Sequence, residues 1–166
     1  MKKLVVLRHG NYHTIEKRDV LTPVGVDQMI GIADKIESQR HGQTVSIYTS
    51  TADRAIESGQ IINQHLKGEI KPPAEFLYEG WSSETDNFAL IKRVGDSFKH
   101  QLFVDADLSE IVVIVTHLDT FQRVAETIIH AMKPQHQTNM LKECKWAPEQ
   151  GEARWFDLEQ KTTFLL

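Results

Sequence analysis

Two short apolar runs, each about as long as one β-strand, constrain the fold of this chain more than any other feature. Residues 4–7 and 111–115 contain no polar side chain, and the second run consists of Val and Ile alone. Continuous runs of this kind are typical of strands that are buried on both faces of a parallel sheet. Residues 45–49 are predicted to form a third strand of the same sheet.

Segments with the apolar spacing of amphipathic helices separate these strands. Thr22 is a suitable N-cap and Pro23 a suitable first residue for one helix. Ser50 and Thr51 are suitable capping residues for a second helix. The other predicted elements are a weaker strand over residues 70–78, helices over 88–102 and 119–132, and a closing hairpin formed by 153–158 and 162–166.

Strands that alternate with helices imply right-handed crossovers between parallel strands. We therefore predict an α/β three-layer sandwich, with a mostly parallel central sheet and helices on both faces. The length of 166 residues fits a single domain over residues 1–166. In sheets of this kind, ligands bind beyond the carboxyl ends of the strands.

Composition excludes several classes of partner. The net charge is −4 and Lys and Arg form no basic run, so we expect no nucleic-acid partner. The one cysteine, Cys144, cannot form an internal disulfide and is expected to have no role. The apolar run at residues 4–7 is too short for a signal peptide or a membrane span. We expect a cytoplasmic protein with no membrane partner.

Polar side chains gather where the three predicted strands end. Arg8 and His9 follow the first strand, Ser50 and Arg54 follow the second, and His117 follows the third. Because the carboxyl ends of parallel strands meet at one edge of a sheet, we expect two arginines and two histidines to lie close together there.

This set of residues points to a phosphate ligand. Neighbouring guanidinium groups need an anion, and their planar forks match phosphate oxygens. Helix N-termini at the same edge favour an anion as well. A neutral imidazole is a competent nucleophile near neutral pH. Arg8, Arg54 and a protonated His117 are suited to hold the charge that develops on phosphoryl oxygens.

Four sequence blocks occur in an order and spacing that we recognise. Together they resemble the histidine phosphatase superfamily, which includes phosphoglycerate mutases and SixA-type phosphohistidine phosphatases. The resemblance extends from the first strand to the helix after His117. The blocks are Leu7-Arg8-His9-Gly10, Leu21-Thr22-Pro23-Val24-Gly25-Val26-Asp27-Gln28, Tyr48-Thr49-Ser50-Thr51-Ala52-Asp53-Arg54-Ala55 and Val115-Thr116-His117.

The resemblance implies roles for particular residues. His9 becomes phosphorylated, while Arg8, Arg54 and His117 bind the phosphoryl oxygens. An acidic residue protonates the leaving oxygen and then activates water. Relatives often place this acid in a Leu-x-Glu segment, which Glu79 matches here. Glu84 and Asp86 are the alternatives.

The chain departs from the family pattern at several positions. The Ser-Pro before the second arginine is replaced by Ser50-Thr51, and a usual Thr-Ala pair by Ser58-Gly59. An asparagine that often binds phosphate has no clear counterpart, and Asn11 or Thr14 is the candidate for this contact. Leu118 follows His117 where mutases commonly have glycine, which is closer to the SixA-type branch.

No cofactor or metal is expected, although the chain contains eight histidines. His9 and His13 are four residues apart, but their segment is predicted to be a loop rather than a helix. No further ligands with suitable spacing accompany them.

We predict a metal-independent phosphatase that acts on a phosphorylated small molecule or a phosphoprotein. A phosphoglycerate-mutase-type phosphotransferase is the alternative with the same chemistry. Only residues 55–116 separate Arg54 from His117, and this short segment favours an open pocket and hydrolysis. A non-catalytic phosphate-binding or interaction module is the alternative from another class. The physiological substrate and the oligomeric state stay open.

Overall fold

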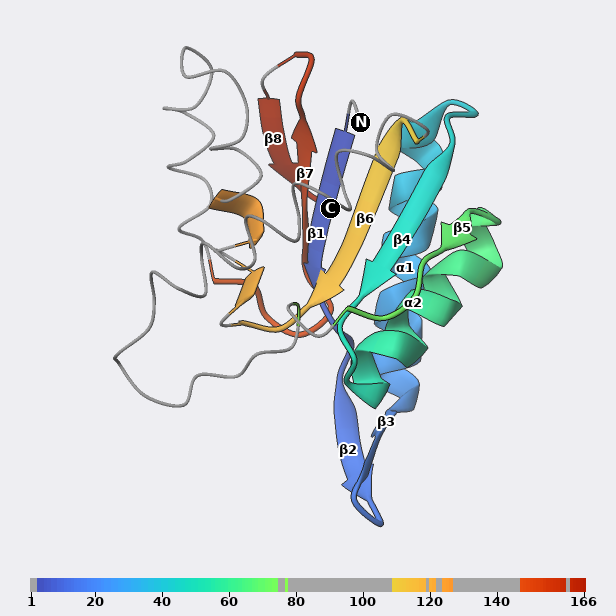
Figure 1. Cartoon of the computed structure of the whole chain (residues 1–166), viewed down its shortest axis with the longest axis vertical. Coiled ribbons are helices and arrows are strands. Elements are labelled where there is room, and N and C mark those ends of the chain that lie inside the picture. The colour runs from blue at the N-terminus through green and yellow to red at the C-terminus, as the bar shows by residue number, and fades with distance from the viewer. Residues whose placement is uncertain are drawn as a thin grey trace.

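The computed structural model describes residues 3–74, 77, 109–118, 120–121, 124–126, 147–160 and 162–166. Its centre is a six-stranded sheet of order β5-β4-β6-β1-β7-β8 (Figure 1). Neighbouring strands from β5 to β1 are parallel, and β7 and β8 are antiparallel to their neighbours. The strands are β1 (Lys3–Arg8), β4 (Val45–Thr49), β5 (Glu69–Ile70), β6 (Ile111–Thr116), β7 (Ala153–Asp157) and β8 (Thr162–Leu165).

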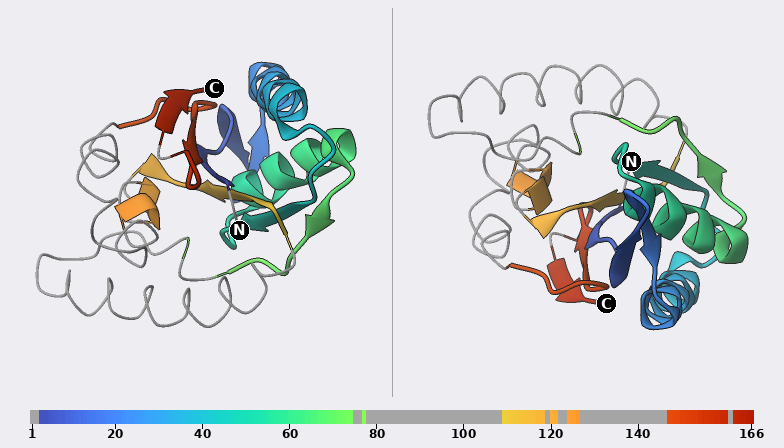
Figure 2. Two further views of the ribbon diagram at one scale, coloured as in Figure 1. Left: turned by 90° about the horizontal axis from the view of Figure 1, so that it is seen from above. Right: turned by 90° about the horizontal axis from the view of Figure 1, so that it is seen from below.

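The sheet has apolar clusters on both faces, as the continuous apolar runs predict. Leu4 and Val6 of β1 belong to one cluster, whereas Val5 and Leu7 belong to the other. Helices α1 (Pro23–Arg40) and α2 (Asp53–Leu66) cover the second face. Three side chains of the helical turns after β6, Phe121, Val124 and Ala125, pack into the first cluster. Figure 2 shows these two groups of helical residues on opposite sides of the sheet.

This arrangement confirms the predicted α/β fold with a mainly parallel central sheet. The closing hairpin is also confirmed, because β7 and β8 pair antiparallel. The helix predicted over 88–102 and much of the one predicted over 119–132 lie outside the described residues. That residues 1–166 form one domain stays a prediction. Among the described residues, no helix is long and apolar enough to cross a membrane.

The helix starts agree only in part with the predicted caps. The side chain of Thr22 caps α1 by accepting a hydrogen bond from the amide of Gly25, at 3.1 Å, and Pro23 begins the helix. For α2 the prediction was wrong, because the N-cap is Ala52 and no side chain caps the helix. The side chain of Ser50 instead forms a hydrogen bond with His117. Asp53 lies in the first turn of α2, where the helix dipole favours a negative charge.

The strand predicted over 70–78 is only partly formed among the described residues of this segment. Of these residues, Ile70 pairs with β4 as part of β5, and an isolated bridge joins Ala74 to Ser50. Pro72 and Pro73 lie between these two contacts. Because proline has no backbone N–H, the pair interrupts the ladder.

A second sheet, formed by a hairpin, follows the first strand where a loop was predicted. Strands β2 (Tyr12–Ile15) and β3 (Arg18–Leu21) pair antiparallel, and the hairpin projects beyond the main sheet (Figure 1). Both turn residues, Glu16 and Lys17, have positive φ angles of 49° and 71°. Such turns usually contain Asn or Gly, so this sequence carries no hairpin signal. Residues 13–18 are exposed, so this segment also lacks the buried apolar residues at alternate positions from which a strand is predicted.

Candidate active site

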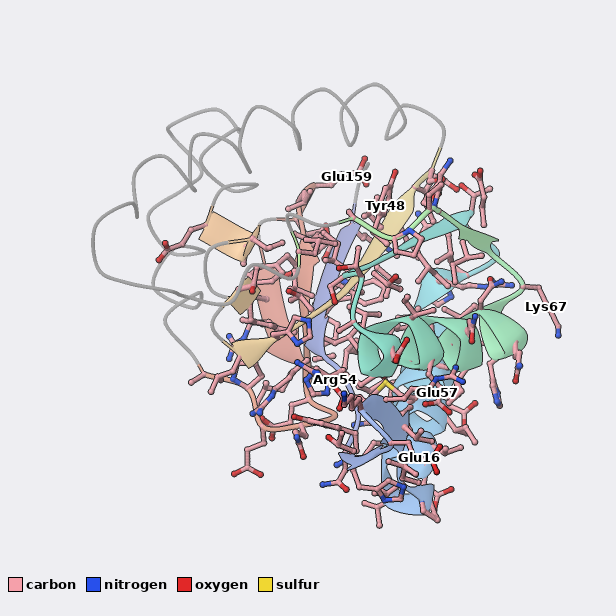
Figure 3. All side chains as sticks on the ribbon, turned by 60° about the horizontal axis from the view of Figure 1, so that its bottom comes forward. Glu16, Tyr48, Arg54, Glu57, Lys67 and Glu159 are labelled. Carbon is pink, nitrogen blue, oxygen red and sulfur yellow. The ribbon has the colours of Figure 1, made fainter. Side chains whose placement is uncertain are left out.

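The fold brings the predicted residues to one end of the sheet. His9 follows β1, His117 follows β6, and Arg54 lies in the first turn of α2. The two imidazole rings are buried, and their centroids are 5.0 Å apart. Arg54 lies between the sheet and the hairpin, whose tip is marked by Glu16 in Figure 3.

The hydrogen bonds of His9 determine which ring nitrogen carries the proton. Arg54 Nε donates to His9 Nε2 at 3.0 Å, and a guanidinium group can only donate. Nε2 is therefore unprotonated, and Nδ1–H donates to the backbone oxygen of Gly10 at 2.9 Å. This tautomer places a lone pair of Nε2 in the site.

The charge state of His9 follows from its surroundings. Burial lowers the pKa of His9 to about 4; the hydrogen bond to Gly10 opposes the shift, and the charges of Arg54 and Arg8 add to it. The imidazole is therefore neutral near pH 7, which is the form that can attack phosphorus.

His117 has the opposite tautomer. Arg54 Nη2 lies 3.2 Å from His117 Nδ1, which must accept the hydrogen bond, so Nε2–H donates to Ser50 Oγ at 2.7 Å. Burial, followed by the proximity of His9 and the charge of Arg54, lowers the pKa of His117 to about 3. The sequence predicted a protonated His117, whereas the lowered pKa makes this ring neutral near pH 7, because burial and the nearby charge of Arg54 disfavour a further positive charge.

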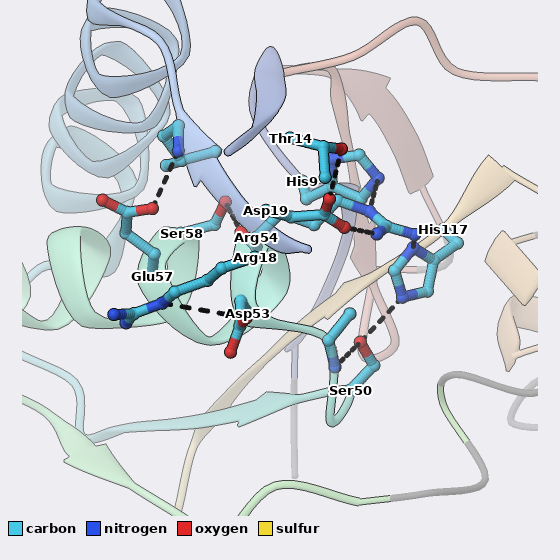
Figure 4. Close-up of polar contacts among 12 residues, drawn as sticks. His9, Thr14, Arg18, Asp19, Ser50, Asp53, Arg54, Glu57, Ser58 and His117 are labelled. Carbon is cyan, nitrogen blue, oxygen red and sulfur yellow. Dashed lines mark hydrogen bonds and ion pairs between the residues drawn. The ribbon is translucent and has the colours of Figure 1, made fainter. Parts of the chain in front are cut away.

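Arg54 is the centre of the polar network in Figure 4. Besides the two histidines, it contacts Asp19 through an ion pair between Nη1 and Oδ2. The guanidinium carbon lies 4.7 Å from the ring centroid of Tyr12, in a cation–π contact. Tyr12 also packs edge-on against His9, with 5.2 Å between ring centroids.

Asp19 is a site residue that sequence reasoning missed. It lies in β3, and Thr14 of β2 donates a hydrogen bond to its Oδ1 at 2.8 Å. Burial alone would raise the pKa of Asp19, but hydrogen bonds from Thr14 and Arg54 and the charge of Arg54 outweigh it and lower the pKa. A predicted hairpin would have placed Asp19 near Arg54, but the turn carried no signal for one.

Arg8 lies at the same end of the sheet. Its Nη1 donates to the backbone oxygen of Pro148 at 3.3 Å. Its Nε is buried and has no hydrogen-bond partner among the described residues. An anion is the natural partner for such a donor.

Asn11, predicted to contact phosphate, is engaged by other side chains. Its Oδ1 accepts from Thr22 at 2.8 Å, and its Nδ2 donates to Gln150 at 2.9 Å. The side chain of Gln28 links the same two residues. It accepts a hydrogen bond from the backbone N–H of Asn11 and donates one to the backbone oxygen of Gln150, both at 2.9 Å. The second sequence block thus holds the loop after His9 in position. A phosphate contact by Asn11 stays a prediction.

Ser58 couples this loop to the helix that carries Arg54. The side chain of Ser58 accepts from the amide of Gly10 at 3.2 Å and donates to the backbone oxygen of Arg54 at 2.6 Å. This departure from the family pattern therefore has a structural role.

The acid candidates Glu79, Glu84 and Asp86 lie outside the described residues, so the acid stays a prediction.

We expect Gly25→Ala to destabilise the protein by about 1–3 kcal/mol, measured by urea unfolding. A Cβ atom at Gly25 would collide with the backbone oxygen of Asn11. Gly31 lies in the same helix, and a Cβ atom added there would meet nothing within 4 Å. Gly31→Ala is therefore the control, and we expect it to stabilise the helix by about 0.5–1 kcal/mol. Equal effects of the two substitutions would contradict the tight contact at Gly25.

The chain has the phosphoglycerate-mutase-like fold that the resemblance inferred from the sequence implied. No protein-family model matches the chain.

Individual solved structures with this fold include phosphatases. A Nakamurella multipartitia protein described as a candidate SixA phosphohistidine phosphatase is similar with a TM-score of 0.65 and 17% identity, covering 99% of this chain and 93% of the other. A mycobacterial glucosyl-3-phosphoglycerate phosphatase in complex with VO3 has a TM-score of 0.64 and 12% identity, covering 99% and 97%. The protein histidine phosphatase SixA in complex with tungstate has a TM-score of 0.62 and 12% identity, covering 99% and 94%.

In sequence, the chain is similar to the human mitochondrial serine/threonine-protein phosphatase PGAM5. The two are 32% identical over 90 residues. The matched segment is 51% of this chain and only 30% of the human protein.

Proposed function

We propose that the protein is a metal-independent phosphatase that transfers a phosphoryl group first to His9 and then to water. The observation that carries this proposal is the state of His9, a neutral imidazole whose Nε2 lone pair faces Arg54. The donor at this lone pair is Arg54, a cation that is itself suited to bind phosphoryl oxygens, so an incoming phosphoryl group would draw Arg54 away and leave Nε2 free to attack.

In the first step, Nε2 of His9 attacks phosphorus, and the bond between phosphorus and the leaving oxygen or nitrogen breaks. The leaving atom takes a proton from the acid, for which we propose Glu79, with Glu84 and Asp86 as alternatives. In the second step, the same carboxylate takes a proton from water, the water oxygen attacks phosphorus, and the bond to Nε2 breaks. Inorganic phosphate leaves, and His9 is again neutral.

Arg8, Arg54 and His117 bind the phosphoryl oxygens in this proposal. Phosphoryl transfer spreads negative charge over three oxygens, and catalysis depends on positioned cationic and polar donors. Nε of Arg8 is a buried donor with no partner among the described residues, and Arg54 supplies a planar fork. His117 donates to a phosphoryl oxygen from Nδ1 once this nitrogen has taken up a proton, which the negative charge of the bound phosphoryl group favours.

For the substrate, we propose a phosphomonoester or a protein phosphohistidine. The relatives with this fold include a glucosyl-3-phosphoglycerate phosphatase and the protein histidine phosphatase SixA, which supports both kinds of substrate. The short segment between Arg54 and His117 favours a site that admits a phosphorylated protein side chain. A cytoplasmic location is part of the same proposal.

The proposal is tested by hydrolysis of an aryl phosphate in excess chelator, with a phosphohistidine peptide as the second substrate. We expect phosphate release at the same rate with and without chelator, because the attacking group is an imidazole and not a metal-bound hydroxide. The control is a metal-dependent phosphatase that the chelator inactivates. Activity that depends on added divalent metal, or no activity on either substrate, would contradict the proposal.

A further inference from the structure

We propose that Asp19 is an internal ligand of Arg54, which takes the place of a phosphoryl oxygen in the free protein and so weakens the binding of phosphate. The inference rests on the proposed function and adds to it a residue that sets the affinity for phosphoryl ligands.

Both carboxylate oxygens of Asp19 have partners. Oδ2 pairs with Nη1 of Arg54, and Oδ1 accepts from Thr14 at 2.8 Å. The side chains of Arg54 and Asp19 are only 16% and 21% exposed, so solvent and salt screen the pair weakly. A carboxylate on a guanidinium matches a phosphoryl group in charge and in the direction of its hydrogen bonds.

The hairpin that carries Asp19 is attached to the helix that carries Arg54. Glu57 of α2 accepts a hydrogen bond from the backbone amide of Leu21 in β3 at 2.8 Å. Figure 4 shows this attachment beside the contact between Asp19 and Arg54. The position of Asp19 is therefore built into the fold.

A phosphoryl group cannot enter while Arg54 keeps all of its present contacts. Reacting atoms approach to about 3–3.5 Å before a bond forms. Nε of Arg54 lies 3.0 Å from Nε2 of His9 and so occupies the place that phosphorus must take. Arg54 has to move its donors onto the phosphoryl oxygens, and the incoming negative charge then competes with Asp19 for the guanidinium.

This competition acts on substrate and product alike, because both carry a phosphoryl group. A change in affinity that is equal for the ground state and the transition state alters KM without altering the chemical step. Asp19 therefore raises KM and the inhibition constant of phosphate together. The function of such an internal ligand is to expel phosphate after hydrolysis.

The test compares tungstate binding by calorimetry in the full chain and in Asp19→Asn. We expect the variant to bind tungstate about tenfold more tightly, because a competing negative charge is removed and the side-chain shape is kept. KM for an aryl phosphate and the inhibition constant of phosphate should fall by similar factors. Asp53→Asn is the matched control, since this aspartate also pairs with an arginine but is half exposed, and its partner is Arg18 and not Arg54. We expect it to bind tungstate as the parent does.

Unchanged or weaker tungstate binding in Asp19→Asn overturns the inference. Loss of turnover without tighter binding overturns it too and indicates that the carboxylate takes part in proton transfer. Asp19→Ser removes the same charge and is measured in the same way if the asparagine variant does not fold. A parent protein that hydrolyses aryl phosphate while Asp19→Asn gains no affinity contradicts this inference alone. A parent that neither binds tungstate nor hydrolyses aryl phosphate contradicts the proposed function as well.

Discussion

Replacing His9 by alanine is expected to lower kcat for aryl phosphate hydrolysis by about 10⁴-fold or more. The substitution removes the nitrogen that forms the covalent intermediate. His117 is a second neutral imidazole beside Arg54, but in the proposed function it binds a phosphoryl oxygen, and the hydrogen bond from its Nε2–H to Ser50 holds it in that position. The measurement is steady-state phosphate release by the purified variant.

His13→Ala is the matched control for this experiment. His13 lies four residues from His9, but it is exposed on β2. We expect its removal to change kcat less than twofold, on the order of the small effects of exposed substitutions. If His9→Ala kept a tenth or more of the parent activity, His9 could not be the nucleophile.

Replacing Arg54 by methionine is expected to lower kcat/KM by about 10³-fold. Methionine keeps much of the apolar stem, whereas the three donors that face His9, His117 and Asp19 are lost. The variant should also have raised pKa values at both histidines. The charge of Arg54 lowers the pKa of both His9 and His117, so its removal raises both values toward the ordinary 6.5. Burial remains and keeps the rise partial.

Two measurements check this prediction, steady-state kinetics and an NMR titration of the histidine rings. Arg18→Met is the control, because Arg18 is 76% exposed and pairs only loosely with Asp53 at 3.7 Å. We expect the control to keep the parent kcat/KM within about twofold. Activity losses of similar size in both variants, or unchanged histidine pKa values in Arg54→Met, would contradict the central position of Arg54.

The sheet could be predicted from the sequence because its central strands are buried on both faces. Residues 4–7 and 111–115 are continuous apolar runs, which are typical of parallel strands covered by other layers on both faces. The same prediction places Arg8, His9, Arg54 and His117 together, since the ends of parallel strands coincide at one edge. The start of α1 at Pro23 was predictable because a side-chain cap and a proline act locally.

The parts that could not be predicted depend on contacts between distant segments. The hairpin of β2 and β3 is exposed and turns at Glu16 and Lys17, so neither periodicity nor turn composition indicates it. Asp19 enters the site only because this hairpin packs beside α2. Ser50 has the composition of a cap, but a hydrogen bond to His117 engages its side chain. The tautomers of the two histidines likewise follow from the position of one guanidinium group in three dimensions.

Phosphoryl transfer to His9 is best tested by trapping the phosphoenzyme. The protein is mixed with an aryl phosphate in chelator, quenched in alkali within one turnover, digested and analysed by mass spectrometry. We expect a phosphorylated peptide containing His9, stable in alkali and lost in acid, and no such peptide from His9→Ala. Turnover without any phosphoenzyme, or phosphate found on another residue such as Ser50, would contradict the transfer to His9.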